Sequence, residues 1–388
     1  MSNPFLPFAL PAVGEEEIQE VVDTLRSGWL TTGPKTKRFE QDFAKFIGIP
    51  HALAVNSCTA GLHLALEAIG IQAGDKVITT PYTFTATAEV IRYFGADPIF
   101  VDINPHTFNI DPQRIAETLR TTANVKAIMP VHIAGQACDM ANILKLAEQY
   151  NIKVVEDAAH ALPTRYQGQM VGTLGDITIF SFYVTKPVAT GEGGMIVTRH
   201  EAYAEHMNNM RLHGISREVF KRTDSDLPSW YYEVVAPGFK YNMSDLMSAL
   251  GIHQLAKANQ FWQRRSEIAE FYHQGLADLP LTLPVTIQDS SHAWHLYIIQ
   301  LALEELTIDR NTFTRLMAEA GIGVSVHFIP LHTQPYWQQR YDFQSHDFPV
   351  AWDVYQRVVS LPIYPTMTDN DVQRVIHTVR TILTKAQK

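Results

Sequence analysis

Between residues 50 and 200, short apolar runs alternate with longer segments in which apolar residues recur at helical spacing. The strand-like runs are KVITTP, DPIFVDI, VKAIMPVHI, KVVEDAA, ITIFSF and GMIVT. Helices are predicted in the gaps, notably over residues 59–69, 85–93, 112–119 and 139–150. Because this alternation is typical of βαβ units, we predict an α/β protein with a mainly parallel sheet that helices cover on both faces.

The pattern changes in the last third of the chain. A long helical stretch, ANQFWQRRSEIAEFYHQGLADL, is followed by the strand-like HAWHLYIIQLAL, the helix-like NTFTRLMAEAG and the strand-like GVSVHF. Such an order is typical of a small α+β domain. We therefore predict a large domain over residues 1–255 and a smaller C-terminal α+β domain over residues 256–388.

Composition narrows the possible functions. The formal net charge of -9 over 388 residues argues against a general nucleic-acid partner or an anionic membrane surface. The start of the chain, MSNPFLPFALPAVGEEE, does not resemble a secretory signal, and no apolar run approaches the roughly 20 residues that a membrane span requires. Two cysteines, Cys58 and Cys138, cannot form a disulfide framework. We expect a cytoplasmic protein without nucleic-acid, membrane or metal partners.

Polar residues fall at or just after the ends of three predicted strands, at Asp102, His132 and Asp157. Functional side chains of parallel sheets gather at these carboxyl ends. Asp157 and its neighbour Glu156 end an almost wholly apolar strand, where a carboxylate is costly unless it is paired or hydrogen-bonded. Taken alone, such an aspartate is more often a helix-capping or turn residue. His160 is either a structural histidine or a second functional contact.

The stretch SFYVTKPVATGEGGMIVT places one lysine, Lys186, between an aromatic-rich run and a glycine-rich loop. Lysine is rarely buried without a reason, and a partly desolvated amine is suited to forming a Schiff base. The alternative is a surface lysine in an exposed loop, which is the commoner situation. The GEGG segment matches neither the GxGxxG nor the GxxxxGKS/T nucleotide-binding pattern.

The segment AVNSCTAGLHLAL follows a predicted strand and opens a helix at Ser57 to Gly61. Small and hydroxyl residues at a helix start leave backbone N–H groups free to bind phosphate. The same residues are common helix N-caps, and for this segment alone a cap is the more frequent explanation.

These signals converge on one small molecule. A phosphate cradle, a carboxylate for a pyridinium nitrogen, an aromatic at the strand end in TTPYTFTAT and a single lysine are what pyridoxal phosphate requires. The carboxylate keeps the ring nitrogen protonated, so that the ring accepts electrons when the substrate loses its α-proton. Lys186 would hold the cofactor and then move that proton.

Motifs along nearly the whole chain strengthen this interpretation. They are SGWLTTGPKTKRFE, NSCTAGLHLAL, PYTFTATA, DINPHTFNIDP, PVHIAGQACDM, VEDAAHA, FSFYVTK, GEGGMIVT, APGFKYNMSDLMSALGIHQL, HAWHLYII and SVHFIPLHTQPYW. In their content and order they resemble the DegT/DnrJ/EryC1/StrS family of sugar aminotransferases, pyridoxal-phosphate enzymes with the aspartate aminotransferase fold (fold type I). Within the family the chain looks closest to the branch that aminates the 4-keto position of nucleotide-linked sugars, which includes the UDP-4-amino-4-deoxy-L-arabinose aminotransferase.

The resemblance implies cofactor contacts at matching positions. Lys186 corresponds to the lysine that forms the Schiff base and Asp157 to the carboxylate at the ring nitrogen. Phe84 matches the aromatic stacked on the ring, and His160 the polar residue near the ring hydroxyl. The implied phosphate contacts are Thr59, Ala60 and Ser181.

The resemblance also implies a homodimer with shared active sites. The neighbouring subunit completes the site in the family through the segment GFKYNM, which makes Lys240 and Asn242 candidates for phosphate or substrate contacts. Four further residues lie in family segments near the substrate, namely Trp29, Thr32, His327 and His332. Two departures limit the transfer of roles: many relatives have asparagine where this chain has Pro187, and others have GYNYR where it has GFKYN.

The implied activity is an amino transfer from glutamate, which becomes 2-oxoglutarate, to a nucleotide-linked keto-sugar. A sugar dehydratase of the same family is the nearest alternative, but in one such group histidine replaces the lysine that this chain keeps as Lys186. A non-catalytic regulator with this fold is a second alternative. A nicotinamide oxidoreductase should show a glycine fingerprint after its first strand, and the chain has none.

Overall fold

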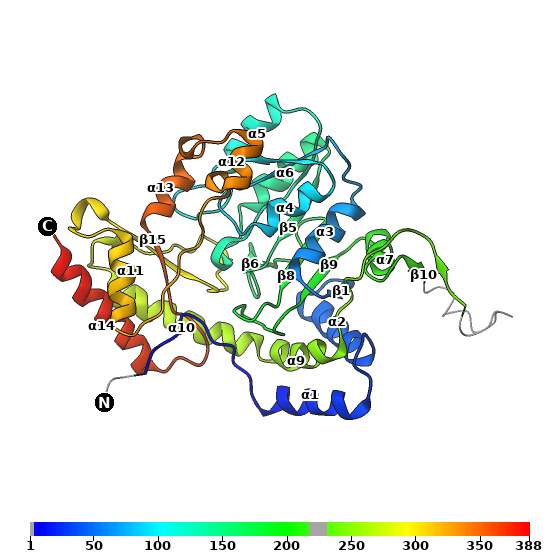
Figure 1. The fold of residues 1–388 in the computed structure, drawn as a ribbon, viewed down its shortest axis with the longest axis horizontal. Helices are drawn as coiled ribbons and strands as arrows, with labels where there is room; N and C mark the ends of the chain where they lie inside the picture. Colours follow the sequence, from blue (N-terminus) through cyan, green and yellow to red (C-terminus); the bar gives the residue numbers. More distant parts are fainter. Residues whose placement is uncertain (1–3, 217–230) are drawn as a thin grey trace.

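A seven-stranded sheet forms the centre of the large domain in the computed structural model, which describes residues 4–216 and 231–388 (Figure 1). Its strand order is β1-β9-β8-β5-β4-β2-β3. The strands are β1 His51–Val55, β2 Lys76–Thr79, β3 Asp97–Phe100, β4 Val125–Ile128, β5 Lys153–Asp157, β8 Ile177–Ser181 and β9 Gly194–Thr198. β9 runs antiparallel to β1 and β8, and the other pairs are parallel. The mainly parallel sheet predicted from sequence is confirmed.

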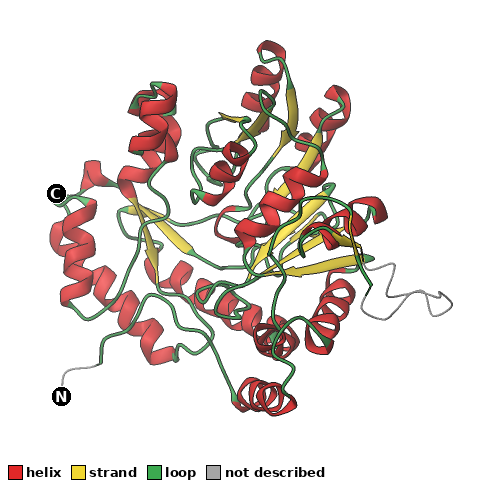
Figure 2. Cartoon of the chain, turned by 45° about the vertical axis from the view of Figure 1, so that its right-hand side comes forward, coloured by secondary structure: helices red, strands yellow, loops and turns green. Residues whose placement is uncertain are grey.

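Helices cover both faces of this sheet (Figure 2). They are α1 Glu15–Ser27, α2 Pro34–Ile47, α3 Cys58–Ala68, α4 Ala86–Tyr93, α5 Pro112–Thr121, α6 Met140–Tyr150, α7 Glu201–Met210 and α9 Asp245–Ala256. The helices predicted between the strands correspond to α3, α4, α5 and α6, with ends that differ by one or two residues. Two small sheets lie outside it. One has three strands in the order β13-β6-β7, namely β6 Arg165–Tyr166, β7 Gln169–Met170 and β13 Ser290–Ser291, and the other pairs β10 Ile215–Ser216 with β11 Glu233–Val234.

Alternation along β5 assigns each of its side chains to one face of the sheet. Val154 belongs to the apolar cluster that contains α2 and α6, whereas Val155 belongs to the cluster that contains α3 and α4. Since successive strand residues point to opposite faces, the Glu156 side chain lies on the same face as Val154, and the Asp157 side chain lies on the same face as Val155. The two adjacent carboxylates therefore lie on different sides of the sheet.

The small domain is built on a second, three-stranded antiparallel sheet, ordered β12-β14-β15. Its elements are α10 Ala258–Leu276, β12 Leu281–Thr282, β14 Tyr297–Leu301, α11 Arg310–Glu319, α12 Pro335–Tyr341, α13 Pro349–Arg357, β15 Val358–Leu361 and α14 Asp369–Ala386. The predicted strand in HAWHLYIIQLAL and the predicted helix in NTFTRLMAEAG are both present, as β14 and α11.

The strand predicted for GVSVHF is wrong. Among the described residues, this segment forms only a single bridge, between Ser325 and Ser360. His327 lies in the same segment: its Nδ1 is 2.8 Å from Ser360 Oγ of β15, and its carbonyl accepts from the Tyr82 hydroxyl of the large domain. The segment is thus held between the two domains and does not extend the small sheet as a strand.

Two helices meet end to end where the chain passes from one domain to the other. Lys257 is at once the last cap of α9 and the first cap of α10. The N-terminal segment also reaches the small domain, because Leu6 pairs with Ile322 and is buried in its core. The division at residues 255 and 256 stays a prediction. Within residues 4–216 and 231–388, no helix is long and apolar enough to cross a membrane.

Candidate active site

A cavity of about 490 Å³ opens at the carboxyl end of β5, between the large sheet and the small domain. It contains seven of the residues singled out from sequence: Thr59, Phe84, Asp157, His160, Ser181, Lys186 and His327. These residues come from five separate stretches of the chain, so only the fold brings them together.

Lys186 lies in the loop after β8, where its backbone N–H donates to Tyr183 O. Its side chain is half-buried and lines the cavity. Burial lowers the pKa of Lys186 to about 8, while Cys58 and Asp157 act in the opposite direction. The amine is therefore far more often neutral near pH 7 than an ordinary lysine, and a neutral amine is the nucleophilic form.

Asp157 ends β5 with its carboxylate buried beside this lysine. Thr87 Oγ1 donates to Asp157 Oδ2 at 2.7 Å, and the Ala159 N–H donates to Oδ1 at 3.1 Å. Burial raises the pKa of Asp157, whereas the two hydrogen bonds and Lys186 lower it. The carboxylate is held by two donors and still lines the cavity.

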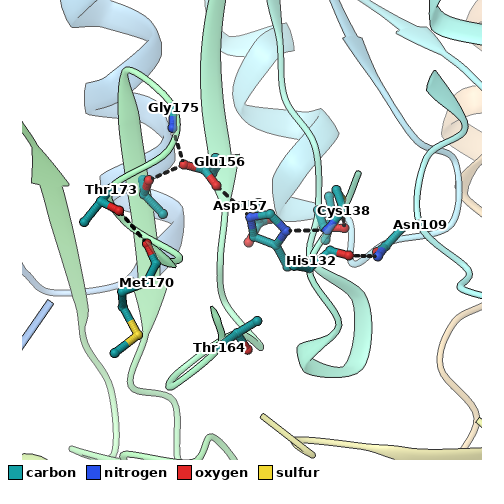
Figure 3. A network of polar contacts seen from close by, with 12 residues as sticks. Asn109, His132, Cys138, Glu156, Asp157, Thr164, Met170, Thr173 and Gly175 are labelled. Atoms are coloured by element: carbon teal, nitrogen blue, oxygen red, sulfur yellow. Dashed lines mark hydrogen bonds and ion pairs between the residues drawn. The ribbon is translucent and has the colours of Figure 1, made fainter. Parts of the chain in front are cut away.

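Glu156 has a separate set of contacts on the opposite side of β5 (Figure 3). The Thr178 hydroxyl and the Gly175 N–H each donate to Glu156 Oε1 at 2.7 Å. His132 Nε2 lies 2.9 Å from Glu156 Oε2, and its Nδ1 accepts from the Cys138 N–H at 3.0 Å. The sequence placed His132 and Asp157 together at strand ends, but only Asp157 lines the cavity.

Three imidazoles stand around the cavity, from His160, His295 and His327. Burial, followed by Lys186, lowers the pKa of each, well below the usual value for His160 and His295 and to about 4 for His327. His160 Nδ1 accepts from the Ala134 N–H at 3.2 Å, so its single proton sits on Nε2. Neutral imidazoles leave Lys186 as the one titratable cation in the cavity lining described by the structure.

The N-terminus of α3 has both a capping residue and a hydroxyl side chain that lines the cavity. Ser57 is the helix cap, with its Oγ accepting from the Ala60 N–H at 3.1 Å. Thr59 lines the cavity and takes no part in the cap. Ala60 is buried in the core outside the lining, and its N–H is already used. Thr59 thus remains the better placed of the two predicted phosphate contacts.

Phe84 and Ser181 approach the cavity from other strand ends. Phe84 lies between β2 and α4 and is 61% exposed, an unusual exposure for phenylalanine unless another flat group covers it. Ser181 is the last residue of β8, with a half-buried side chain that lines the cavity.

The remaining predicted residues lie outside the cavity of their own chain: Trp29, Thr32, Lys240, Asn242 and His332. Asn242 Nδ2 donates to Thr32 Oγ1 at 2.6 Å, and the backbone of this segment bridges to β1. Lys240 is exposed at that edge. His332 is fully buried in the small domain, with its Nε2 3.2 Å from Ser345 O.

Three cavity residues were not singled out as site residues from sequence, Cys58, His295 and Phe328, and neither was Thr87, which lies behind the cavity and donates to Asp157. Each lies in or next to a motif that was noticed, but nothing in a single sequence separates these side chains from their neighbours. Thr87 could have been suspected from PYTFTATA, since a buried carboxylate needs a hydroxyl or amide donor. Among the described residues no metal-binding cluster occurs.

The cavity suits the cofactor that the sequence pointed to. It offers one weakly basic lysine, one buried carboxylate, an exposed aromatic face and hydroxyls at a helix start. Together with the sheet order these features define a fold-type-I pyridoxal-phosphate enzyme.

Comparisons with known proteins agree. The DegT/DnrJ/EryC1/StrS aminotransferase family matches residues 11–380. The spore coat polysaccharide biosynthesis protein SpsC of Bacillus subtilis is 49% identical over 383 residues, 98% of each chain. A putative sugar aminotransferase from Streptococcus pneumoniae in its PLP form has a TM-score of 0.90 at 32% identity, covering 99% of this chain and 100% of that one.

A third relative is PseC of Helicobacter pylori, an aminotransferase involved in the biosynthesis of pseudoaminic acid, with a TM-score of 0.91 at 28% identity over 98% of this chain and 100% of that one. The chain belongs to the DegT/DnrJ/EryC1/StrS aminotransferase family. It is a pyridoxal-phosphate-dependent sugar aminotransferase.

Proposed function

We propose that the protein moves an amino group from glutamate to the 4-keto group of a nucleotide-linked sugar, and that it does so as a cytoplasmic homodimer. The glutamate donor and the 4-position follow from the family resemblance. The nucleotide is supported by a second hollow beside the cofactor cavity. SpsC is named for spore coat polysaccharide biosynthesis and PseC for the biosynthesis of pseudoaminic acid, and both names support a role in sugar biosynthesis.

The side hollow, a space of about 890 Å³, shares Thr83, Phe84 and Phe328 with the cofactor cavity. Two exposed aromatic rings line it, Tyr93 and Tyr336, which are 57% and 53% exposed. A nucleotide-linked sugar has a flat heterocycle at the end opposite its reacting carbon, and exposed tyrosine rings stack well on such bases. The hollow thus provides a place for the base while the sugar occupies the cavity.

Within the cavity, each side chain has a distinct proposed task. When bound, pyridoxal phosphate supplies an aldehyde that carries the amino group and a ring that accepts electrons. The Asp157 carboxylate would bind the proton of the ring nitrogen, and the exposed face of Phe84 would orient the ring. His160 would present its Nε2 proton, and Thr59 and Ser181 would bind the phosphate. Lys186 Nζ, weakly basic because it is buried, would take the α-proton of the amino donor and then deliver it.

The test is a panel of UDP- and dTDP-linked keto-sugars offered with glutamate, with the amino-sugar product measured by mass. Tyr336→Ala should raise KM for the accepted substrate about tenfold, whereas Tyr336→Phe keeps the ring and should keep KM. Amination of unlinked keto-sugars at the same efficiency would overturn the nucleotide proposal.

The competing functions predict different outcomes in the same experiment. A dehydratase would release a deoxygenated sugar and leave the nitrogen of glutamate in place. A non-catalytic regulator would bind the sugar without turnover. Retention of Lys186 beside Asp157 in one cavity favours the aminotransferase over both.

A further inference from the structure

Glu156 is a carboxylate on the side of β5 opposite the cofactor cavity, and it is completely buried. Three donors surround it: the Thr178 hydroxyl, the Gly175 N–H and His132 Nε2 (Figure 3). A buried carboxylate is costly unless such donors surround it. None of the roles proposed for the cavity residues involves the Glu156 carboxylate.

His132 is locked in one tautomer. Its Nδ1 accepts a hydrogen bond from the Cys138 N–H at 3.0 Å, so the ring has no proton there. Its one proton is on Nε2, 2.9 Å from Glu156 Oε2. The Nε2 N–H therefore points at the Glu156 carboxylate, and both side chains are fully buried.

The backbone of His132 is also joined to Asp157. The His132 N–H donates to Asp157 O at 3.1 Å, and the Asp157 N–H donates to Pro130 O at 2.9 Å. His132 thus binds two successive residues of β5, Glu156 through its side chain and Asp157 through its backbone. The same residue is therefore hydrogen-bonded both to Glu156 and to the residue whose carboxylate lines the cavity.

We propose that Glu156 and His132 are positioning residues, which hold the Asp157 carboxylate in the orientation that meets the cofactor ring without touching the cofactor themselves. Asp157 needs such support because its own side chain has only two donors, Thr87 and Ala159, and its burial is costly. The proposal rests on pyridoxal phosphate as the cofactor and is independent of the sugar and its nucleotide.

A double-mutant cycle tests this coupling through the affinity for pyridoxal phosphate. Glu156→Gln should raise the dissociation constant of pyridoxal phosphate from the apoenzyme about tenfold when Asp157 is present, the usual size for residues in one hydrogen-bond network. In the Asp157→Asn variant, the additional Glu156→Gln change should raise this dissociation constant by less than about twofold. The absorption maximum of the bound cofactor should move in the same direction in Glu156→Gln as in Asp157→Asn.

A matched control is Asp102, a buried carboxylate that follows β3 and accepts from the N–H groups of Val350 and Ala351. Asp102→Asn should lower the melting temperature but change neither the dissociation constant nor the absorption maximum. If Glu156→Gln does not fold, His132→Gln, which keeps an N–H donor, and His132→Leu, which has none, replace it in the cycle. His132→Gln should then raise the dissociation constant of pyridoxal phosphate less than His132→Leu does.

Equal losses of affinity with and without Asp157 would overturn the proposal, because a purely structural effect does not depend on the cavity carboxylate. An unchanged absorption maximum in a variant that binds the cofactor weakly would overturn it as well. Either result would make Glu156 and His132 parts of the core alone.

Discussion

Thr87 Oγ1 lies 2.7 Å from Asp157 Oδ2 and donates a hydrogen bond to it from another element of the fold. Thr87 is in α4 and is completely buried, so no water competes for its hydroxyl. The contact holds one oxygen of the Asp157 carboxylate. The described cavity lining contains one other carboxylate, Glu192 at the glycine-rich loop. A helix that looks structural in the sequence thus takes part in the cofactor site.

Thr87→Val removes this donor while keeping the size of the side chain. The pKa of Asp157 should rise further, because burial then has one fewer opposing hydrogen bond. We expect about a tenfold weaker affinity for pyridoxal phosphate, in line with the loss of a hydrogen bond to a charged group. Titration of the apoenzyme measures this. Thr85→Val, which loses only a 3.3 Å contact to Glu89, is the control and should bind the cofactor normally.

Lys186→Ala should abolish the covalent link to pyridoxal phosphate that borohydride reduces, while the protein stays folded. Lys186 is the one lysine in the cavity lining described here, and its amine forms no ion pair with the described residues whose loss would unfold the chain. Mass spectrometry after reduction measures the link. Lys153→Ala, on an exposed lysine of the same sheet, should retain it. A reducible adduct in the Lys186 variant would refute the assignment.

The pH dependence of cofactor capture follows from the lowered pKa of Lys186. Only the neutral amine attacks an aldehyde, and burial moves the pKa from 10.5 to about 8. The rate at which apoenzyme captures pyridoxal phosphate should therefore rise with pH through about 8 and then level off. The rate measured in parallel for Nα-acetyl-lysine, whose ε-amine is free in water, gives the unperturbed reference. A rate that keeps rising together with the reference would show that Lys186 is not desolvated.

Subunit mixing tests the shared active site. Lys240 is exposed and lies outside the cavity of its own chain, so a catalytic contribution has to be made to a neighbouring subunit. Inactive Lys186→Ala subunits mixed with inactive Lys240→Ala subunits should recover part of the activity, because one site in each mixed dimer has both lysines. Both parents must be inactive, and subunit exchange must be verified by mass. Under those conditions, a mixture without activity would exclude the shared site.

The sequence alone was sufficient for the class of fold and for the cofactor. Periodic apolar runs predicted the strands and helices between residues 50 and 200, because burial on both faces of a parallel sheet imposes that pattern on the chain. Lys186 and Asp157 were found since a lysine and a carboxylate at apolar strand ends are costly and therefore stand out. The family motifs led to the cofactor.

Tertiary structure decided what each polar residue does. Glu156 and Asp157 are adjacent and alike in sequence, but the alternation of β5 directs one to His132 and the other to the cavity. GVSVHF has a strand-like sequence, yet its described pairing is a single bridge to Ser360, and the His327 carbonyl accepts a hydrogen bond from Tyr82 of the large domain. Such outcomes depend on which distant groups supply hydrogen bonds in a buried site, and a local pattern contains no information about partners that lie far away in the chain.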